Sequence, residues 1–312
     1  MPMNTRQARV IDPVLSNHAR GYKNADFVAQ ELFPRVTVSQ RGGTRIEFGR
    51  ESFRLQNTRR APGAETERLQ LGYAGQRFAL AQERLMAMVP VEIAEEAERG
   101  PGIDAEQAAV SMTMDKILLS LEVEAAQLAR DVSNYASGNT VALSGSDKWT
   151  DGGSNPQEVI DDALNTVRQR IGRMPNLLLL GPVAYRALRR HAKIREQFKY
   201  TSGKSITTDM LAEYFGVRRV VAAHGVYLDA AAPENAPASD IWGNDAILAY
   251  VPAGARTMLE PSFAYTYQRR GTPAVEKGAY NHDRRAWEYP VISEQAAQIV
   301  GPDAGFLIQN AA

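Results

Sequence analysis

The chain has 312 residues, of which 44% are hydrophobic and 23% charged, which is typical of a globular protein large enough to hold more than one domain. Its 36 basic and 36 acidic residues give a formal net charge of zero, which disfavours a protein that wraps nucleic acid in a general basic coat. The chain has no cysteine, which excludes disulfides, zinc–thiolate sites and a cysteine nucleophile. Neither a signal-peptide pattern nor an apolar run of the roughly 18 residues needed for a membrane span is visible, so we expect a cytoplasm-like compartment.

The first 39 residues form an irregular N-terminal segment. A short helix is predicted there that Pro34 ends, because the residue before a proline avoids the helical region, and a strand follows. Residues 40–81 then predict a long hairpin, with strands near Thr44–Phe48 and Tyr73–Ala81.

The tip of this hairpin, residues 53–68, is rich in Arg, Pro, Gly and Glu and has no core-forming pattern. Long structureless loops are uncommon inside compact domains, and an isolated two-stranded ribbon is only marginally stable in water. One interpretation is a floppy surface loop. The other is an arm held by a neighbouring subunit, which we favour because the strands carry apolar side chains that an isolated ribbon cannot bury.

A long helix is predicted next. It opens at Asp104, a candidate N-cap with Gln107 three residues on, and neither Gly nor Pro interrupts it before Gly138. About 30 residues at about 1.5 Å each make a rod of roughly 45 Å, which fits either a plain core helix or a spine on which a flat subunit is laid out. Its apolar stripe is Met114, Ile117, Leu118, Leu121, Ala125, Leu128 and Val132.

A polar run around Trp149 separates the long helix from the next one. Asn155 is the candidate N-cap of that next helix, Pro156 its first residue and Gly172 its candidate C-cap. Strands and capped helices then alternate to about Pro252, which predicts an α/β unit with a sheet covered by helices. We interpret Trp149, Asn155 and Pro156 as the boundary of this unit.

The last part of the chain, residues 255–312, returns to β structure. Its β-forming residues alternate or cluster between turns. Together with the long helix, these late strands predict a second, β-rich half, with the α/β unit inserted between the two. The fold class expected for the whole chain is α+β.

Few residues suggest catalysis. The four histidines form no metal-binding pair, and His191, beside two arginines, is expected to be solvated. His282 and Asp283 are adjacent, and adjacent residues of a strand point to opposite faces. The stretch Thr201–Ser205 resembles the end of a phosphate-binding loop but lacks the earlier glycine. We therefore predict no catalytic, cofactor-binding or metal-binding residues.

Basic residues recur as adjacent arginine pairs with acids nearby. A surface that binds single-stranded nucleic acid would interleave aromatic residues on one face, whereas these pairs are scattered. We interpret them as partners in ion pairs between subunits, with plain surface solvation as the alternative. The pairs are Arg59 and Arg60, Arg189 and Arg190, Arg218 and Arg219, Arg269 and Arg270, and Arg284 and Arg285.

Taken in order, several stretches resemble the major capsid proteins of tailed bacteriophages, which have the Hong Kong 97 type of shell-subunit fold. The N-terminal arm of one large branch of that family is similar to LSNHARGYKNADFVAQELFPRVTV, and the tip of its extended loop to RRAPGAE. The axial domain is similar to LSGSDKWTDGGSNPQEVIDDALNTVR, MPNLLLLGPVAYRALRRHAKIREQFKYT and LAEYFGVRRVVAA, and a later strand to IWGNDAILAYVP. These stretches cover most of the chain.

The resemblance implies a Hong Kong 97-like capsid subunit with four parts. They are an N-terminal arm at 1–39, an extended β-hairpin loop at 40–81, a peripheral domain with the spine helix at 82–150 and 255–312, and an axial α/β domain at 151–254. It further implies pentamers and hexamers in an icosahedral head around double-stranded DNA, with the loop reaching over a neighbour. The implied inter-subunit contacts of the loop are Phe53, Arg54, Arg59, Arg60, Glu65, Glu67 and Arg68.

The resemblance also implies partners and a location. The partners are other copies of the chain, a scaffolding protein or protease, a portal and a decoration protein, with packaged DNA contacted non-specifically and no membrane. The location is the virion capsid, assembled in the cytoplasm of the bacterial host. Some family members crosslink through a Lys and an Asn, but the tip at 53–68 has no Lys, so we assign no such pair.

Three other interpretations stay open. A nanocompartment shell protein of the encapsulin kind shares the fold and would enclose an enzyme cargo in place of DNA. An enzyme is suggested by the α/β unit, because such sheets bind ligands at their strand ends. A minor structural protein, such as a decoration or connector subunit, is the third.

Overall fold

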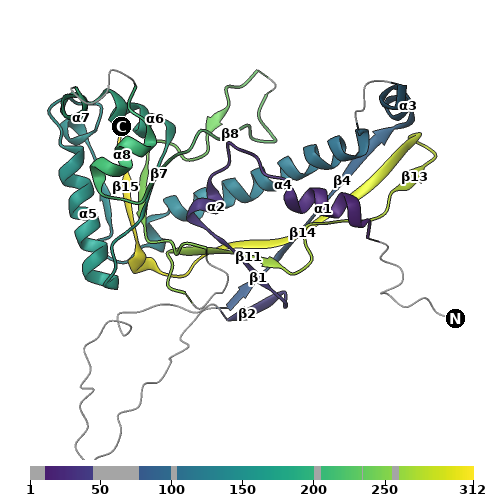
Figure 1. Ribbon diagram of the computed structural model, residues 1–312, viewed down its shortest axis with the longest axis horizontal. Helices are drawn as coiled ribbons and strands as arrows, with labels where there is room; N and C mark the ends of the chain where they lie inside the picture. The colour runs from purple at the N-terminus through teal and green to yellow at the C-terminus, as the bar shows by residue number, and fades with distance from the viewer. Residues whose placement is uncertain (1–10, 45–76, 100–103, 200–204, 234, 255–259) are drawn as a thin grey trace, which may run out of the picture.

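The computed structural model describes residues 11–44, 77–99, 104–199, 205–233, 235–254 and 260–312. In Figure 1, helix α4 (Ala105–Arg130) runs from a helix-covered sheet at one end of the molecule along a longer sheet toward the other end. Helices and sheets are mixed throughout, which confirms the predicted α+β class.

The helices fall into three groups. Two short ones lie in the N-terminal segment, α1 (Pro13–Gly21) and α2 (Ala29–Leu32), and α2 ends just before Pro34 as predicted. The second group consists of α3 (Val91–Arg99) and the long helix α4 that follows it. The helices that cover the shorter sheet are α5 (Pro156–Ile171), α6 (Pro182–Arg190), α7 (Ala192–Phe198) and α8 (Thr208–Phe215).

Helix α4 begins as predicted but ends earlier. The Asp104 carboxylate accepts a hydrogen bond from the Gln107 amide at 3.0 Å, which satisfies a free donor of the first turn. The helix stops at Arg130 because Asp131 is extended and its carboxylate caps the short 3-10 turn that follows. Val132, predicted to continue the stripe, therefore lies beyond the helix and is exposed. The buried apolar residues of α4 are Val110, Met114, Ile117, Leu118, Leu121, Ala125, Ala126 and Ala129.

The longer sheet is built around strand β14 (Ala286–Ile299), which pairs antiparallel with four others. These four are β4 (Ala81–Pro90), β11 (Ala264–Arg269), β12 (Ala274–Val275) and β13 (Ala279–Asn281). Strand β1 (Arg35–Val38) extends the sheet by pairing parallel with β11. One sheet thus unites the N-terminal segment, the stretch after the predicted loop and the late strands.

The shorter sheet has the strand order β5, β15, β10, β6, β7. Its members are β5 (Thr140–Ala142), β6 (Leu177–Leu180), β7 (Arg219–Ala222), β10 (Ala246–Ala249) and β15 (Gly305–Gln309). Two of them, β5 and β15, come from outside the range 151–254. They join because β15 pairs with the edge of β10, which would otherwise leave a row of backbone donors and acceptors unpaired.

Two small ribbons complete the described strands. Strands β2 (Gly42–Thr44) and β3 (Arg77–Ala79) pair antiparallel at the base of the predicted hairpin loop. Strands β8 (Val226–Tyr227) and β9 (Ser239–Asp240) pair antiparallel in the stretch between β7 and β10. The first ribbon confirms that the two predicted strands of residues 40–81 pair with each other where they are described.

The buried core couples the two sheets. Leu178 of β6 points into a cluster formed with α5, α6 and α8, whereas its neighbour Leu179 points into a second cluster with Leu121 and Ala125 of α4. Successive residues of a strand face opposite sides, so β6 is buried on both faces. A third cluster lies between α1, the N-terminal half of α4 and the longer sheet. Helix α4 is therefore the element that both sheets share.

The helices over the shorter sheet end largely as predicted. Gly172 and Gly216 take left-handed conformations, with φ of 68° and 66°, and close α5 and α8 as C-caps. The stretch VAYRALRRHAKI, residues 183–194, forms two helices and not one, because His191 is extended and separates α6 from α7.

Candidate assembly surfaces

The base of the extended loop is tied to the longer sheet. The Phe78 ring of β3 stacks on the Tyr267 ring of β11, with centroids 4.3 Å apart. The Leu80 amide donates a hydrogen bond to the Arg41 carbonyl at 2.8 Å. Both strands of the ribbon therefore leave the body from a fixed position.

A buried carboxylate on β14, Glu294, holds the same base electrostatically. Its Oε2 accepts from Arg41 Nε at 2.8 Å, and its Oε1 accepts from Arg41 Nη2 at 2.9 Å and from Arg269 Nη1 at 2.6 Å. These bonds, chiefly those from Arg41, hold the pKa of Glu294 below its ordinary value, although burial opposes the shift. Glu294 thus joins the ribbon base, β11 and β14 in one charged network.

The N-terminal segment docks on the longer sheet through α1. The Asp12 carboxylate accepts from the amides of Val14 and Leu15 at 2.9 and 3.0 Å and caps the helix. The Ser16 hydroxyl donates to the Val275 carbonyl at 3.3 Å and accepts from the Val275 amide at 2.9 Å. The Ser16 side chain thus binds both backbone groups of Val275, the last residue of β12, and ties α1 to that strand.

A second buried carboxylate, Glu122 of α4, joins three parts of the chain. Its Oε1 accepts from the Val28 amide at 2.9 Å and from the Trp242 indole nitrogen at 2.7 Å, and its Oε2 accepts from the Ala29 amide at 2.8 Å. Burial raises the pKa of Glu122, and the three hydrogen bonds oppose that rise. The N-terminal segment, the long helix and the loop before β10 therefore meet at one side chain.

The end of α4 is pinned to the shorter sheet by an ion pair. Arg130 Nε donates to Asp245 Oδ2 at 2.6 Å, and the Asn310 amide donates to Asp245 Oδ1 at 2.9 Å. Gly243 lies against this pair with φ of +56°, and a Cβ there would be 2.6 Å from Arg130 Nη2. The positive φ favours glycine at position 243, and a Cβ there would also push the Arg130 guanidinium away from Asp245.

The polar run around Trp149 folds onto the shorter sheet. Trp149 is fully buried in the core of that unit, and its amide donates to the Ala311 carbonyl at 2.8 Å. His191, expected to be solvated, is instead buried, with Nε2 3.1 Å from Ser154 Oγ and 3.2 Å from the Asp151 carbonyl. Burial lowers the pKa of His191. The arginine neighbours misled the prediction, because the chain turns at His191 and directs its ring inward.

The two other boundary residues behave differently from each other. Pro156 is the first residue of α5, a position that the fixed φ of proline favours, and it is buried. Asn155 precedes the helix as predicted, but its side chain does not cap the backbone. With φ of −127° and ψ of 80°, it instead donates from Nδ2 to Glu158 Oε2 at 3.0 Å.

Several of the paired arginines have partners inside the chain. Arg269 binds Glu294, Arg219 forms an ion pair with Glu31, and Arg285 lies 3.6 Å from Glu92. The last two pairs are largely exposed, so each contributes little to stability. These three arginines therefore have an acidic partner within the chain, and their pairing between subunits stays a prediction.

The remaining chemical candidates remain apart. His282 and His224 contact tyrosine rings, and His18 Nε2 lies 2.8 Å from Ser111 Oγ. Of the stretch Thr201–Ser205, only Ser205 is described. Within the described ranges, no group of three or more His, Asp and Glu side chains is placed to hold a metal ion. No helix among those residues is long and apolar enough to cross a membrane.

The predicted contacts of the loop tip lie outside the described residues; they are Phe53, Arg54, Arg59, Arg60, Glu65, Glu67 and Arg68. The structure instead identifies Glu122, Asp245 and Glu294, which sequence reasoning missed. Each is an acid within or beside an apolar stretch, in LSLEVEAA, NDAILAY and VISEQAA. An acid within an apolar stretch was the available signal, because buried carboxylates occur almost only where partners are present.

Three comparisons with known proteins match this chain over most of its length to phage or phage-related proteins. The sequence model of the family described as phage major capsid protein E matches residues 59–274. A major capsid protein of Burkholderia phage BcepMu is 36% identical over 306 residues, which cover 97% of each chain. A crystal structure of a phage-related protein from Bordetella bronchiseptica is 37% identical and superposes with a TM-score of 0.86, covering 98% of this chain and 99% of that one.

More distant solved structures share the fold. A putative capsid protein of an Escherichia coli prophage has a TM-score of 0.56 at 11% identity, covering 96% of this chain and 99% of that one. An encapsulin of Synechococcus elongatus has a TM-score of 0.53 at 13% identity and covers 96% of both chains. At these identities the likeness extends to the fold alone, which phage shells and encapsulins have in common.

Proposed function

The chain belongs to the phage major capsid protein E family and is the coat protein of a phage, and we propose that it assembles as pentamers and hexamers into an icosahedral head around double-stranded DNA. The observation that carries this proposal is the sequence identity with a phage major capsid protein along nearly the whole length of both chains. Proteins of this family are structural, so the chain is not an enzyme.

In the proposed shell, the shorter sheet with α5 to α8 lies near the capsomer axis, and α4 with the longer sheet lies at the periphery. Trp149, Asn155 and Pro156, predicted to mark the boundary between the two parts, lie inside the axial part in this proposal, because β5 precedes them in the chain and already belongs to its sheet. Strands β5 and β15 belong to the axial part in this proposal, because they complete its sheet. The firm attachment of α4 to both sheets supports a subunit that docks as one rigid piece.

The loop at residues 40–81 reaches over a neighbouring subunit in this proposal, and its tip residues 53–68 make the contact. The support is its anchored base, because Arg41 and Phe78 fix where the ribbon leaves the sheet. An arm with a fixed origin presents its tip with less loss of conformational entropy on docking. Many such overlaps, each weak, stabilise a closed shell through multivalency.

The proposed partners are further copies of the chain, a scaffolding protein or protease, a portal and a decoration protein, with DNA contacted non-specifically. The protein is a component of the virion, and we place its assembly in the host cytoplasm. An encapsulin-like shell is not favoured, since the encapsulin shares the fold at low identity whereas the phage coat protein shares the sequence.

Electron microscopy and sedimentation of the purified chain, over a series of protein and salt concentrations, test this function. We expect capsomers or shells, alone or after addition of the scaffold. A chain that stays monomeric under all these conditions would contradict assembly. Shells that contain an enzyme cargo and no DNA in infected cells would favour a nanocompartment.

A deletion tests the loop separately. Removal of residues 53–68 leaves the anchored ribbon base intact, so we expect the subunit to fold with an unchanged circular dichroism spectrum. Shell assembly should fail, because the overlap onto the neighbour is lost. The matched control replaces the same residues with a Gly/Ser segment of equal length, which keeps the reach and removes the contacts. Normal shells from both variants would show that the tip is not an arm.

A further inference from the structure

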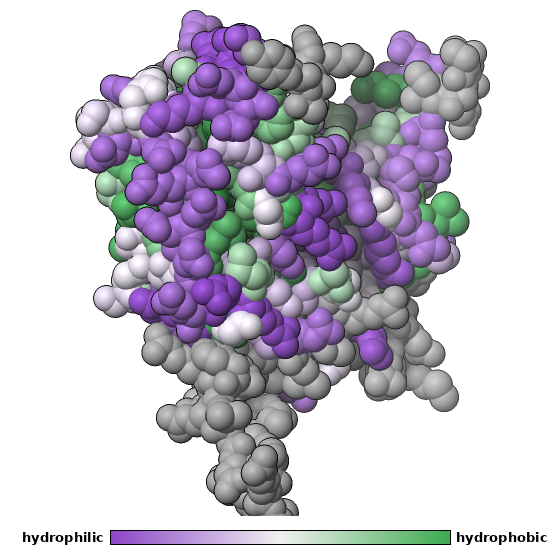
Figure 2. All heavy atoms as spheres, turned by 60° about the vertical axis from the view of Figure 1, so that its left-hand side comes forward, coloured by the Kyte–Doolittle hydropathy of each residue, from purple (hydrophilic) through white to green (hydrophobic). Residues whose placement is uncertain are grey.

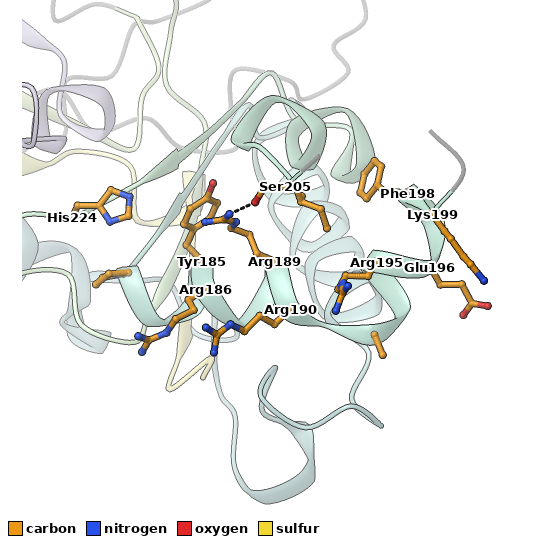
Figure 3. A pocket seen from close by; sticks show the side chains of 13 residues that line it. Tyr185, Arg186, Arg189, Arg190, Arg195, Glu196, Phe198, Lys199, Ser205 and His224 are labelled. Atoms are coloured by element: carbon orange, nitrogen blue, oxygen red, sulfur yellow. Dashed lines mark hydrogen bonds between the residues drawn. The ribbon is translucent and has the colours of Figure 1, made fainter. Parts of the chain in front are cut away.

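A groove of about 1270 Å³ lies over α6 and α7 and carries an excess of positive charge. Figure 3 shows its lining, to which α6 and α7 contribute most of the charged side chains. The end of the molecule turned forward in Figure 2 has a largely hydrophilic surface with small apolar areas. The basic lining residues are Arg186, Arg189, Arg190, Arg195 and Lys199, and Glu196 is the acidic one.

Three of these arginines have no partner within the described part of the chain. Arg186 and Arg190 are one turn apart on α6 and point the same way in Figure 3, and Arg195 follows on α7. All three are exposed. Arg189 differs, because it donates to the Ser205 hydroxyl and lies over the Tyr185 ring, with 5.4 Å from Cζ to the ring centroid. The groove therefore offers fixed geometry together with unpaired positive charge.

The neighbouring helices α5 and α8 carry the opposite charge. Every charged residue in the first two turns of α5 and in the whole of α8 is acidic and exposed. The helices are joined by a hydrogen bond from the Tyr214 hydroxyl to Gln157 Oε1 at 2.8 Å, so their carboxylates form one surface, the acidic face. Its members are Glu158, Asp161, Asp162, Asp209 and Glu213.

We propose that the basic groove of one subunit receives the acidic face of the next subunit around the capsomer axis. This inference rests on the proposed function, and it names the surfaces that close the ring. A ring needs a head-to-tail contact, in which two different patches of the same chain meet. A two-fold contact centred on the groove would instead place the unpaired arginines of two subunits against each other, which like charge disfavours. The second copy is the occupant because the chain itself carries the complementary surface.

The contact predicts a strong effect of salt. Exposed charges are screened over a Debye length of about 10 Å at 0.1 M salt, so the groove and the acidic face attract each other less as salt rises. Complementary charge also fixes the register of neighbours and excludes wrong ones. The pairing therefore sets which faces meet, while area buried elsewhere in the shell supplies much of the affinity.

Charge reversal tests the pairing. The double variant Arg186→Glu/Arg190→Glu should need about tenfold more protein to form capsomers, because acid then faces acid. Asp161→Arg/Asp162→Arg should have the same effect from the other side. The control Arg186→Lys/Arg190→Lys keeps the charge and should assemble like the wild type. The variant with all four reversals restores unlike charges and should assemble within about threefold of the wild type.

A mixture sharpens the test. The two double variants fail alone, but in an equal mixture each has the face that the other now needs. Closed rings must then alternate the two chains, which an even-membered ring allows and an odd-membered ring does not. We expect the mixture to form hexamers and no pentamers, as measured by native mass spectrometry.

Three outcomes would overturn the inference. One is assembly of both double variants within about twofold of the wild type. Another is a variant with all four reversals that assembles no better than the double variants, although circular dichroism melting shows all of them folded. If a reversal prevents folding, Arg186→Gln/Arg190→Gln replaces it. The third is normal shells of the arginine variant that retain less DNA, which would assign the groove to nucleic acid. A wild-type chain that never assembles contradicts the proposed function itself.

Discussion

Replacement of the buried carboxylate of Glu122 tests how the N-terminal segment is held. In Glu122→Gln the side chain keeps its shape and one oxygen, which can still accept from the Val28 amide and the Trp242 indole. The new amide nitrogen takes the place of Oε2 and faces the Ala29 amide, so two donors oppose each other. One buried backbone donor thus loses its acceptor.

The magnitude follows from that lost acceptor. An unsatisfied buried donor costs about 1–3 kcal/mol, and we expect Glu122→Gln to lower the free energy of unfolding by that amount. Glu122→Ala should cost more, because all three donors lose their acceptor and a cavity is left. The control Glu95→Gln changes an exposed acid of α3 and should stay within about 0.5 kcal/mol.

Two measurements check this prediction. Urea denaturation followed by tryptophan fluorescence gives the change in stability, and hydrogen exchange gives its location. A loss of about 1.4 kcal/mol corresponds to a tenfold faster exchange, which should appear at the Ala29 amide before more distant amides of α4. Unchanged protection at Ala29, with a urea midpoint equal to that of the wild type, would refute the role of Glu122 as the joint of the three segments.

Three further predictions concern other joints. Because the pKa of Glu294 is lowered, the stability that the ionised carboxylate contributes is complete above about pH 4.5 and is lost as the pH falls through the lowered pKa. In that acidic range, hydrogen exchange at the Leu80 amide, corrected for the intrinsic rate, should accelerate in the wild type but not in Glu294→Gln. Gly243→Ala should lower the melting temperature more than Gly254→Ala, because both have positive φ but only the first Cβ has a close neighbour. Because the pKa of His191 is lowered, the stability that its neutral ring contributes is complete above the ordinary pKa of 6.5 and falls as the pH drops below that value. The urea midpoint should therefore vary less with pH in His191→Asn than in the wild type. Equal urea midpoints of the wild type above and below pH 6.5 would contradict the prediction for His191.

Local patterns identified most of the individual elements correctly. Asp104 caps α4, Gly172 closes α5 and Pro34 follows the end of α2, because each depends on the conformational preference of one residue and on its immediate neighbours. The run of four leucines forms β6, as its apolar character predicts. Where the local signal conflicted with packing, as at His191, packing decided the outcome.

The sequence by itself determined the α+β class, the order of the elements and the family resemblance, since these follow from preferences and motifs contained in short stretches. Only the tertiary structure decided that β5 and β15 complete the shorter sheet, that Glu122 joins three segments and that Arg269 pairs with Glu294 inside the chain. Each of these contacts joins residues far apart along the chain. Such partners are selected by the shape and polarity of the packed core, which no short window of sequence contains.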